Sequence, residues 1–299
     1  MDFEDKLVSR FDGEAELRKN NALICFSIVE TGKALSRLAI RVIRSKSSEK
    51  GFISLLYFME GPEDIRLREE ADLHKIFMED MTADEREKIT LRVFIESADN
   101  SYEKIARIAE EQKTDLVLLG LNSNEFDPQL FKKFGQLKNN PSHSESFILE
   151  QFEPKYAGTL KNINALFTRN SLSTGLFMDM GALQFRNVFV PILQKSDVHI
   201  FTYLYRMAQQ ENVKIMIWDA IGIIESDAKM QKLYQLTAKR TEGRILLWNN
   251  NKKIECDFIQ DQDLIIIGMG GWNKLICTPL PWTGCLPSTL IIKEATNFN

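Results

Sequence analysis

Three glycines follow a short apolar segment in a pattern that could bind a phosphate. The chain reads DLIIIGMGGW at residues 263–272, so Gly268, Gly270 and Gly271 come directly after a predicted strand, with Trp272 next. Phosphate sites of this kind use backbone N–H groups that point at the anion from the start of a helix. The Gly-x-x-Gly spacing therefore predicts the first turn of a nucleotide site, and Trp272 could stack on a base.

The remainder of such a site is missing from the sequence. A complete site would have a further glycine and a hydroxyl residue where this chain has Pro281 and Trp282. Proline donates no N–H and disrupts a helix, so we expect almost no helix after Gly271. The equivalent position in the first half, Gly120, is followed by Leu-Asn-Ser, and neither Gly-x-x-x-x-Gly-Lys nor Gly-x-Gly-x-x-Gly occurs. We expect a degenerate pocket; the alternative is that residues 268–271 form only a tight strand-to-loop turn.

Groups that could perform catalysis are few in this sequence. The histidines lie far apart: His74 in a charged helix, His143 in a polar loop, and His199 at a helix start, where we expect a cap or a solvent contact. The chain has neither a His-x-x-x-His metal pair nor a Gly-x-Ser-x-Gly nucleophile turn. The sequence therefore predicts that the protein is not an enzyme, holds no metal, and has no cofactor beyond a weakly bound adenine nucleotide.

The cysteines give no sign of a metal or redox motif. Cys25, Cys256, Cys277 and Cys285 show no Cys-x-x-Cys spacing, and two of them lie in apolar surroundings. We expect four free thiols in a reducing compartment.

Length and composition indicate a globular protein with a sizeable core. The chain has 299 residues, 44% of them hydrophobic and 27% charged, which is enough for two ordinary domains. A net charge of −4 without a basic tail argues against a nucleic-acid partner. Apolar runs are strand-sized, and the acidic start MDFEDKLVSR does not resemble a signal peptide.

The glycines belong to a repeated segment. Residues 115–121 read DLVLLGL and residues 263–269 read DLIIIGM, each an apolar run that ends near a glycine. A run that is apolar on both faces suits a central parallel strand covered by helices on each side. The repeat predicts two similar α/β domains.

Other predicted elements pair up in the same order. Amphipathic helices follow the first strands at 35–43 and 201–208, and another is predicted at 101–112. The second half leaves almost no room for a helix between Trp248 and Asp263. The first half also contains an insert at about 122–170, and we place the two domains at 1–184 and 185–299. The predicted strands lie at 22–29, 52–58, 89–95, 116–120 and 175–178, and again at 187–193, 214–219, 244–248, 264–268 and 288–292.

This tandem layout, with Gly-x-x-Gly after a fourth strand, resembles the universal stress protein family. The resemblance implies two tandem universal-stress-protein-like domains (adenine nucleotide alpha hydrolase-like, Rossmann-like) with mostly parallel five-stranded sheets. Ligands in such sheets bind beyond the carboxyl ends of the strands.

The linker between the copies carries a second resemblance. Residues 173–181 read STGLFMDMG, which is similar to a segment in the cytoplasmic tails of monovalent cation:proton antiporters. Gly175, Asp179 and Gly181 match that segment, whereas Met180 replaces its arginine. Further positions that fit these tails are Arg206, Met207, Ala208, Trp282 and Cys285.

The second resemblance implies a non-catalytic regulatory or sensor domain of a Na+/H+ or K+/H+ antiporter. Such a domain would be cytoplasmic and tethered to the inner or plasma membrane by a membrane domain of the same polypeptide. We also expect a homodimer, because an exposed edge strand at 289–293 would invite pairing. The main alternative is a free-standing tandem universal stress protein that binds ATP or AMP, and a nucleotide hydrolase is a third possibility.

Overall fold

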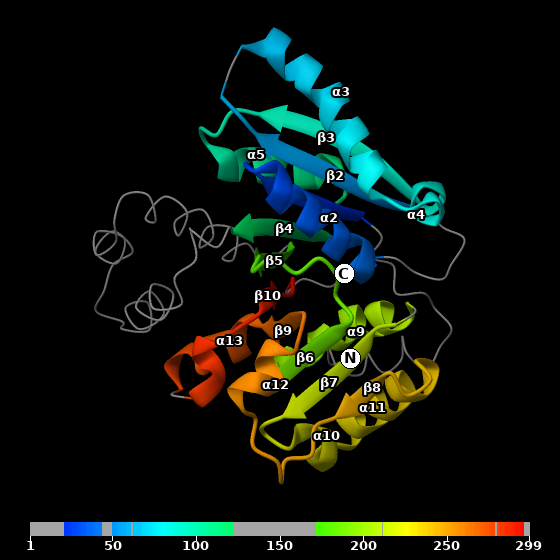
Figure 1. The fold of residues 1–299 in the computed structure, drawn as a ribbon, viewed down its shortest axis with the longest axis vertical. Coiled ribbons are helices and arrows are strands. Elements are labelled where there is room, and N and C mark those ends of the chain that lie inside the picture. Colours follow the sequence, from blue (N-terminus) through cyan, green and yellow to red (C-terminus); the bar gives the residue numbers. More distant parts are fainter. Residues whose placement is uncertain are drawn as a thin grey trace. The chain divides into compact units, whose positions relative to one another are not determined.

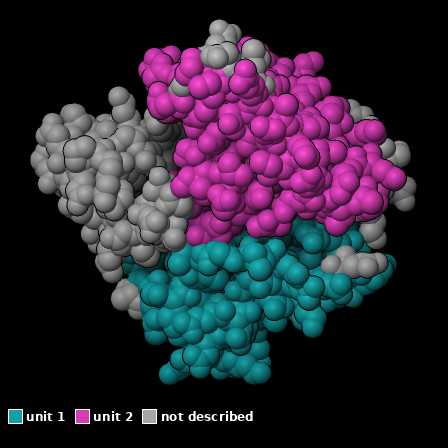
Figure 2. Space-filling view, turned by 45° about the horizontal axis from the view of Figure 1, so that its top comes forward, with its two compact units in different colours: residues 1–20, 40–49, 180–292 teal, residues 21–39, 50–179, 293–299 magenta. Residues whose placement is uncertain are grey.

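The computed structural model describes residues 21–43, 50–60, 62–121, 172–210, 212–278 and 280–295. The chain divides into two compact units, which Figure 2 shows in different colours. Unit 1 comprises residues 1–20, 40–49 and 180–292, and unit 2 comprises residues 21–39, 50–179 and 293–299. The predicted insert at 122–170 and His143 lie outside the described residues, and the boundary at 184/185 stays a prediction.

Unit 2 alternates strands and helices (Figure 1). Within it the strands lie in the order β3-β2-β1-β4-β5, and all four neighbouring pairs are parallel. The strands are β1 (Asn21–Phe26), β2 (Gly51–Phe58), β3 (Ile89–Glu96), β4 (Leu116–Leu121) and β5 (Ser173–Met178). The helices are α2 (Val29–Ile43), of which residues 29–39 belong to unit 2, α3 (Glu63–Asp80), α4 (Ala83–Lys88) and α5 (Ser101–Glu111).

Burial in unit 2 follows the sequence pattern. The central strands β1 and β4 are apolar on both faces, and Leu23 and Val117 are completely buried. Helix α5 packs onto them with the three residues predicted to face inward, Ile105, Ile108 and Ala109. Removing this apolar surface from water is the main favourable contribution to folding.

Unit 1 repeats the same strand arrangement. Its order is β10-β9-β6-β7-β8, so the first strand of each unit lies between the second and the fourth. The strands are β6 (Asn187–Ile192), β7 (Lys214–Asp219), β8 (Ile245–Leu247), β9 (Leu264–Gly268) and β10 (Ser288–Lys293). The helices are η1 (Lys195–Ile200), α9 (Phe201–Ala208), α10 (Ile223–Ser226), α11 (Ala228–Arg240), α12 (Cys256–Gln260), α13 (Met269–Cys277) and η2 (Pro281–Gly284).

The predicted α/β class with a mostly parallel sheet is confirmed, but two helix predictions are wrong. We expected almost no helix after Gly271, whereas α13 runs from Met269 to Cys277. Pro281 does not interrupt it, because that proline lies beyond the helix and begins η2, where a missing N–H has no cost. A five-residue helix, α12, also forms in the interval that had appeared too short for one.

The prediction of four free thiols is wrong for two of them. Cys256 and Cys285 form a disulfide with a Cα–Cα distance of 5.9 Å, whereas Cys25 is buried and Cys277 is exposed as free thiols. The partners are 29 residues apart, so spacing along the chain did not indicate the pair. Burial raises the pKa of the Cys25 thiol far above its usual range, which makes that group unreactive.

The expectation of an exposed strand at 289–293 is also wrong. Thr289, Leu290, Ile291 and Ile292 of β10 are each 0% exposed. The apolar run therefore serves as core, and a homodimer through this strand has no support in its burial.

Candidate functional site

The predicted glycines of unit 1 lie where an open α/β sheet usually binds its ligand. Such sheets bind ligands beyond the carboxyl ends of the strands, at the point where the strand order reverses. In unit 1 the order reverses between β6 and β9. Gly268 is the last residue of β9, and Gly270 and Gly271 form the first turn of α13. The structure therefore brings these glycines to the expected edge of the sheet.

A carboxylate of the protein itself occupies this position. Asp197, in η1 just after β6, accepts hydrogen bonds from the backbone N–H groups of Leu193 and Gln194 at 3.1 Å each. It also accepts one from the N–H of Gly271 at 3.0 Å. Asp197 is completely buried. Its carboxylate thus sits at the N-terminus of α13, the place that favours an anion.

Burial and hydrogen bonding act on this carboxyl in opposite directions. Burial raises the pKa of Asp197, and the three N–H groups and the nearby His199 offset part of that increase. His199 is itself buried at 7% exposed, so the expected solvent contact is wrong. Its Nδ1 lies 2.7 Å from the carbonyl oxygen of Ser196, and among the described residues its buried Nε2 has no hydrogen-bond partner.

The glycines are needed because these side chains approach so closely. A Cβ on Gly268 would lie 3.0 Å from Cγ of Asp197 and 3.2 Å from Cε1 of His199. A Cβ on Gly271 would lie 3.1 Å from the same Cγ, and one on Gly270 would overlap the side chain of Gln194. Each glycine of the predicted site therefore makes room for a residue of this chain.

The equivalent position in unit 2 is filled as well. There the strand order reverses between β1 and β4, and Gly120 lies near the carboxyl end of β4. A Cβ on Gly120 would lie 2.9 Å from Cδ1 of Leu35 and still closer to Cγ2 of Thr31, both in α2. Gly120 thus allows helix α2 to pack closely on β4.

The tryptophans near the glycines are core residues. Trp272 is 2% exposed and Trp282 is 1% exposed, so neither offers an open face at the glycines. The ring of Trp282 packs edge-to-face against Phe189 and Trp218, with 6.0 Å between ring centroids in both pairs. The prediction that Trp272 could stack on a base is therefore wrong, because the ring is buried in the core.

A cavity of about 390 Å³ lies at the same edge of unit 1, at the carboxyl end of β7. Trp218 and Trp282 line it together with residues 250–255 from the connection between β8 and α12. Reasoning from the sequence missed both this cavity and Asp197. The signal for Asp197 is local: an aspartate three residues after the N-cap residue Gln194 can accept from the N-cap backbone N–H, and the structure shows this bond.

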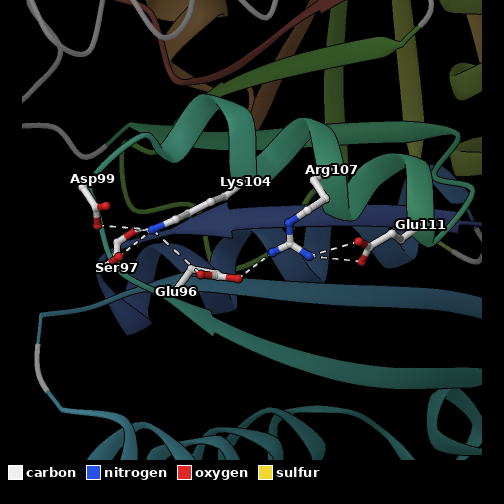
Figure 3. A network of polar contacts seen from close by, with 6 residues as sticks. All are labelled: Glu96, Ser97, Asp99, Lys104, Arg107 and Glu111. Carbon is white, nitrogen blue, oxygen red and sulfur yellow. Dashed lines mark hydrogen bonds and ion pairs between the residues drawn. The ribbon is translucent and has the colours of Figure 1, made fainter.

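Unit 2 has a network of charged groups at the end of β3 (Figure 3). Its members, from β3, the following loop and α5, are Glu96, Ser97, Asp99, Lys104, Arg107 and Glu111. Lys104 Nζ donates to Ser97 Oγ at 2.5 Å and to Asp99 Oδ1 at 3.2 Å. Arg107 pairs with Glu96 at 2.7 Å and with Glu111 at 3.1 Å. Hydrogen bonds from Ser97 and Lys104 lower the pKa of Asp99. Lys104 and Arg107 of α5 both pair with Glu96 at the end of β3, so the network links this helix to the strand.

Within the described part of the chain, no three His, Cys, Asp or Glu side chains are grouped closely enough to hold a metal ion. His74 is exposed on α3. Among the helices described, none is long and apolar enough to cross a bilayer.

Comparison with known proteins finds similarity in structure but not in sequence. The fold is similar to that of the cytoplasmic domain of a prokaryotic cation chloride cotransporter, with a TM-score of 0.52 and 13% sequence identity over 94% of this chain and 98% of that chain. A universal stress protein from Archaeoglobus fulgidus DSM 4304 aligns with a TM-score of 0.44 and 11% identity over 93% of this chain and 97% of that chain. No protein-family model matches the chain, and no curated protein matches it. At these identities the similarity to the transporter domain concerns the fold, and it agrees with the predicted α/β class.

Proposed function

We propose that this chain is a non-catalytic regulatory or sensor domain of a monovalent cation transporter, most specifically of a Na+/H+ or K+/H+ antiporter. In this proposal it lies in the cytoplasm and is tethered by a membrane domain of the same polypeptide. The homodimer is kept on the antiporter resemblance alone, since the strand at 289–293 is buried. The similarity in fold to a cation chloride cotransporter's cytoplasmic domain supports the transporter context, since it extends over nearly all of both chains.

The antiporter assignment rests on the linker segment. Gly175 lies in β5, and the N–H of Asp179 donates to the carbonyl oxygen of Leu121 at 3.2 Å. Gly181 has a φ of 89°, a conformation that favours glycine. Of the residues that match the antiporter tails, Gly181 therefore occupies a position with a definite backbone requirement, just after the exit from β5.

The position of Asp197 is the observation that favours a sensor over a nucleotide-binding protein. A phosphate at the start of α13 would have to displace this carboxylate or lie beside it. Two unit charges about 4 Å apart repel by roughly 4 kcal/mol at an effective dielectric constant of 20. That corresponds to about three decades in affinity, which would move a micromolar site to the millimolar range. We therefore propose a degenerate pocket, against the alternative of a free-standing stress protein that binds ATP or AMP.

Calorimetry with ATP tests the pocket. The wild-type chain and the Asp197→Ala variant are titrated with ATP and with tripolyphosphate, which lacks the base. We expect wild-type binding weaker than about 1 mM at the glycines and a gain for both compounds in the variant. Micromolar ATP binding that is lost when Gly271 is replaced by alanine would contradict the degenerate pocket.

Ion flux tests the transporter role. The complete reading frame that contains this chain is expressed with and without residues 21–295, and Na+/H+ and K+/H+ exchange is measured in membrane vesicles across a pH range. We expect exchange to persist with a changed activation profile. Identical profiles would contradict a regulatory role, and a reading frame without membrane spans would contradict the transporter assignment.

A further inference from the structure

We propose that the cavity at the carboxyl end of β7 binds a small planar organic anion, and that the Cys256–Cys285 disulfide holds its two walls together. This site is separate from the position that Asp197 fills. The inference does not depend on the transporter assignment.

The location and size of the cavity suit a small ligand. Trp218 is the penultimate residue of β7, so the cavity lies at the edge where α/β sheets bind their ligands. One wall is the connection before α12, residues 250–255, and the other is Leu280, Pro281 and Trp282. The volume of about 390 Å³ falls in the lower part of the range of small-molecule sites.

Aromatic rings form the apolar part of the site. Trp218 and Trp282 meet at an interplanar angle of 75° with 6.0 Å between centroids, so each ring restrains the other. Trp248 supports the opposite wall: its Nε1 donates to the carbonyl oxygen of Lys252 at 3.0 Å, and its ring lies 4.5 Å from that of Phe258. Because Trp282 is buried, the half-buried Trp218 supplies the accessible aromatic surface of the lining, and a rigid ring of this kind favours a flat ring as ligand.

The polar part of the site carries a net positive charge. Lys252 and Lys253 line the cavity, and among the described residues no carboxylate forms a salt bridge with either. Glu255 also lines it, so the cavity has two cations against one anion. Asn250 is held in place by donating to the carbonyl oxygen of Asp219 at 3.3 Å. Both lysines are exposed, so a ligand with a carboxylate or phosphate could pair with them.

The disulfide joins the two walls. Cys256 directly follows the lining residue Glu255, and Cys285 directly follows η2, which contains Pro281 and Trp282. Reduction by a dithiol such as dithiothreitol proceeds by two thiol–disulfide exchanges. Two electrons and two protons pass to Cys256 and Cys285, and the dithiol becomes a cyclic disulfide. The two walls then lose their direct covalent link across a sequence separation of 29, and the cavity loses a constraint on its shape.

Calorimetry and tryptophan fluorescence test the ligand class. The probes are AMP and anthranilate, which combine a ring with a phosphate or a carboxylate, and adenosine and ribose 5-phosphate, which have one feature each. We expect AMP or anthranilate to bind at least tenfold more tightly than both adenosine and ribose 5-phosphate. Whichever of AMP and anthranilate binds more tightly indicates whether the site prefers a phosphate or a carboxylate. If no ring-bearing anion binds more tightly than the single-feature probes, the proposal is wrong.

Variants locate the binding and test the disulfide. Lys252→Gln/Lys253→Gln should weaken the preferred anion at least tenfold, whereas Lys214→Gln/Lys239→Gln, which removes two exposed charges elsewhere in unit 1, should leave it unchanged. Dithiothreitol, or Cys256→Ser/Cys285→Ser, should weaken it at least fivefold. Binding that survives the lysine variant places the ligand elsewhere and overturns the proposal. If the reduced protein binds the preferred anion as tightly as the oxidised protein does, the proposed role of the disulfide is wrong.

Discussion

The carboxylate of Asp197 accepts a hydrogen bond from the backbone N–H of Gly271 at 3.0 Å, across 74 residues of sequence. This bond joins the loop after β6 to the first turn of α13. The bond places the negative charge of the Asp197 side chain at the N-terminus of α13, where a bound phosphate would otherwise be stabilised.

Replacing Asp197 with alanine should destabilise the protein and create an anion site. Three N–H groups, one buried and two partly buried, would lose their acceptor, so we expect a loss of about 2–4 kcal/mol in the free energy of unfolding, measured with urea. The same variant should gain affinity for inorganic phosphate, measured by calorimetry.

A second capping carboxylate is the matched control for this substitution. Asp227 caps α11 by accepting from the N–H groups of Lys229 and Met230, but it is partly exposed. Asp227→Ala should cost only about 1 kcal/mol and give no phosphate binding. Equal losses in the two variants would show that burial of Asp197 adds nothing.

The raised pKa of Asp197 predicts a pH dependence of stability. The folded protein then binds this proton more tightly than the unfolded chain, whose Asp pKa is about 3.9. The stabilisation from this difference is complete below about pH 3.9 and is lost as the pH rises through the higher folded value. Urea unfolding from pH 3 to pH 7 should therefore show wild type losing stability relative to Asp197→Asn as the pH rises. The opposite slope would mean that the three N–H groups outweigh burial.

Opening the Cys256–Cys285 disulfide should lower stability by about 3–4 kcal/mol. The estimate follows from the entropy of closing a loop of 29 residues in the unfolded chain. Urea unfolding with and without dithiothreitol measures the loss, and Cys277→Ser, which removes an exposed free thiol, should change nothing. Thiol titration of the denatured, unreduced chain should find two free thiols. Four free thiols would contradict the disulfide.

Replacing Gly120 with alanine should destabilise unit 2 by about 1–3 kcal/mol, since the added methyl group would collide with Leu35 and Thr31. Thermal or urea unfolding measures the effect. Thr31→Ser removes the nearest methyl group and should restore part of the stability in the double variant. Gly284→Ala is the control, because a Cβ there has nothing within 4 Å. A neutral Gly120→Ala would mean that the glycine serves something other than packing.

The α/β layout was predictable because each element shows its own period. The apolar runs 116–120 and 264–268 became β4 and β9, and the inward-facing residues of α5 were identified from helical spacing. These features depend on contacts between near neighbours in the chain and on burial on two faces, and both leave a pattern that can be read locally.

The chemistry of the candidate site depended on contacts between distant segments. The glycines at 268–271 were found from their spacing, but their purpose became clear when the fold placed Asp197 and Gln194 against them. Likewise, the disulfide and the cavity beside it exist because α12 and η2, far apart in the chain, meet in unit 1. Sequence alone determined where the strands end and that glycines stand at those ends. Tertiary structure decided which groups fill the space there, because the partners of a glycine or a cysteine leave no local period.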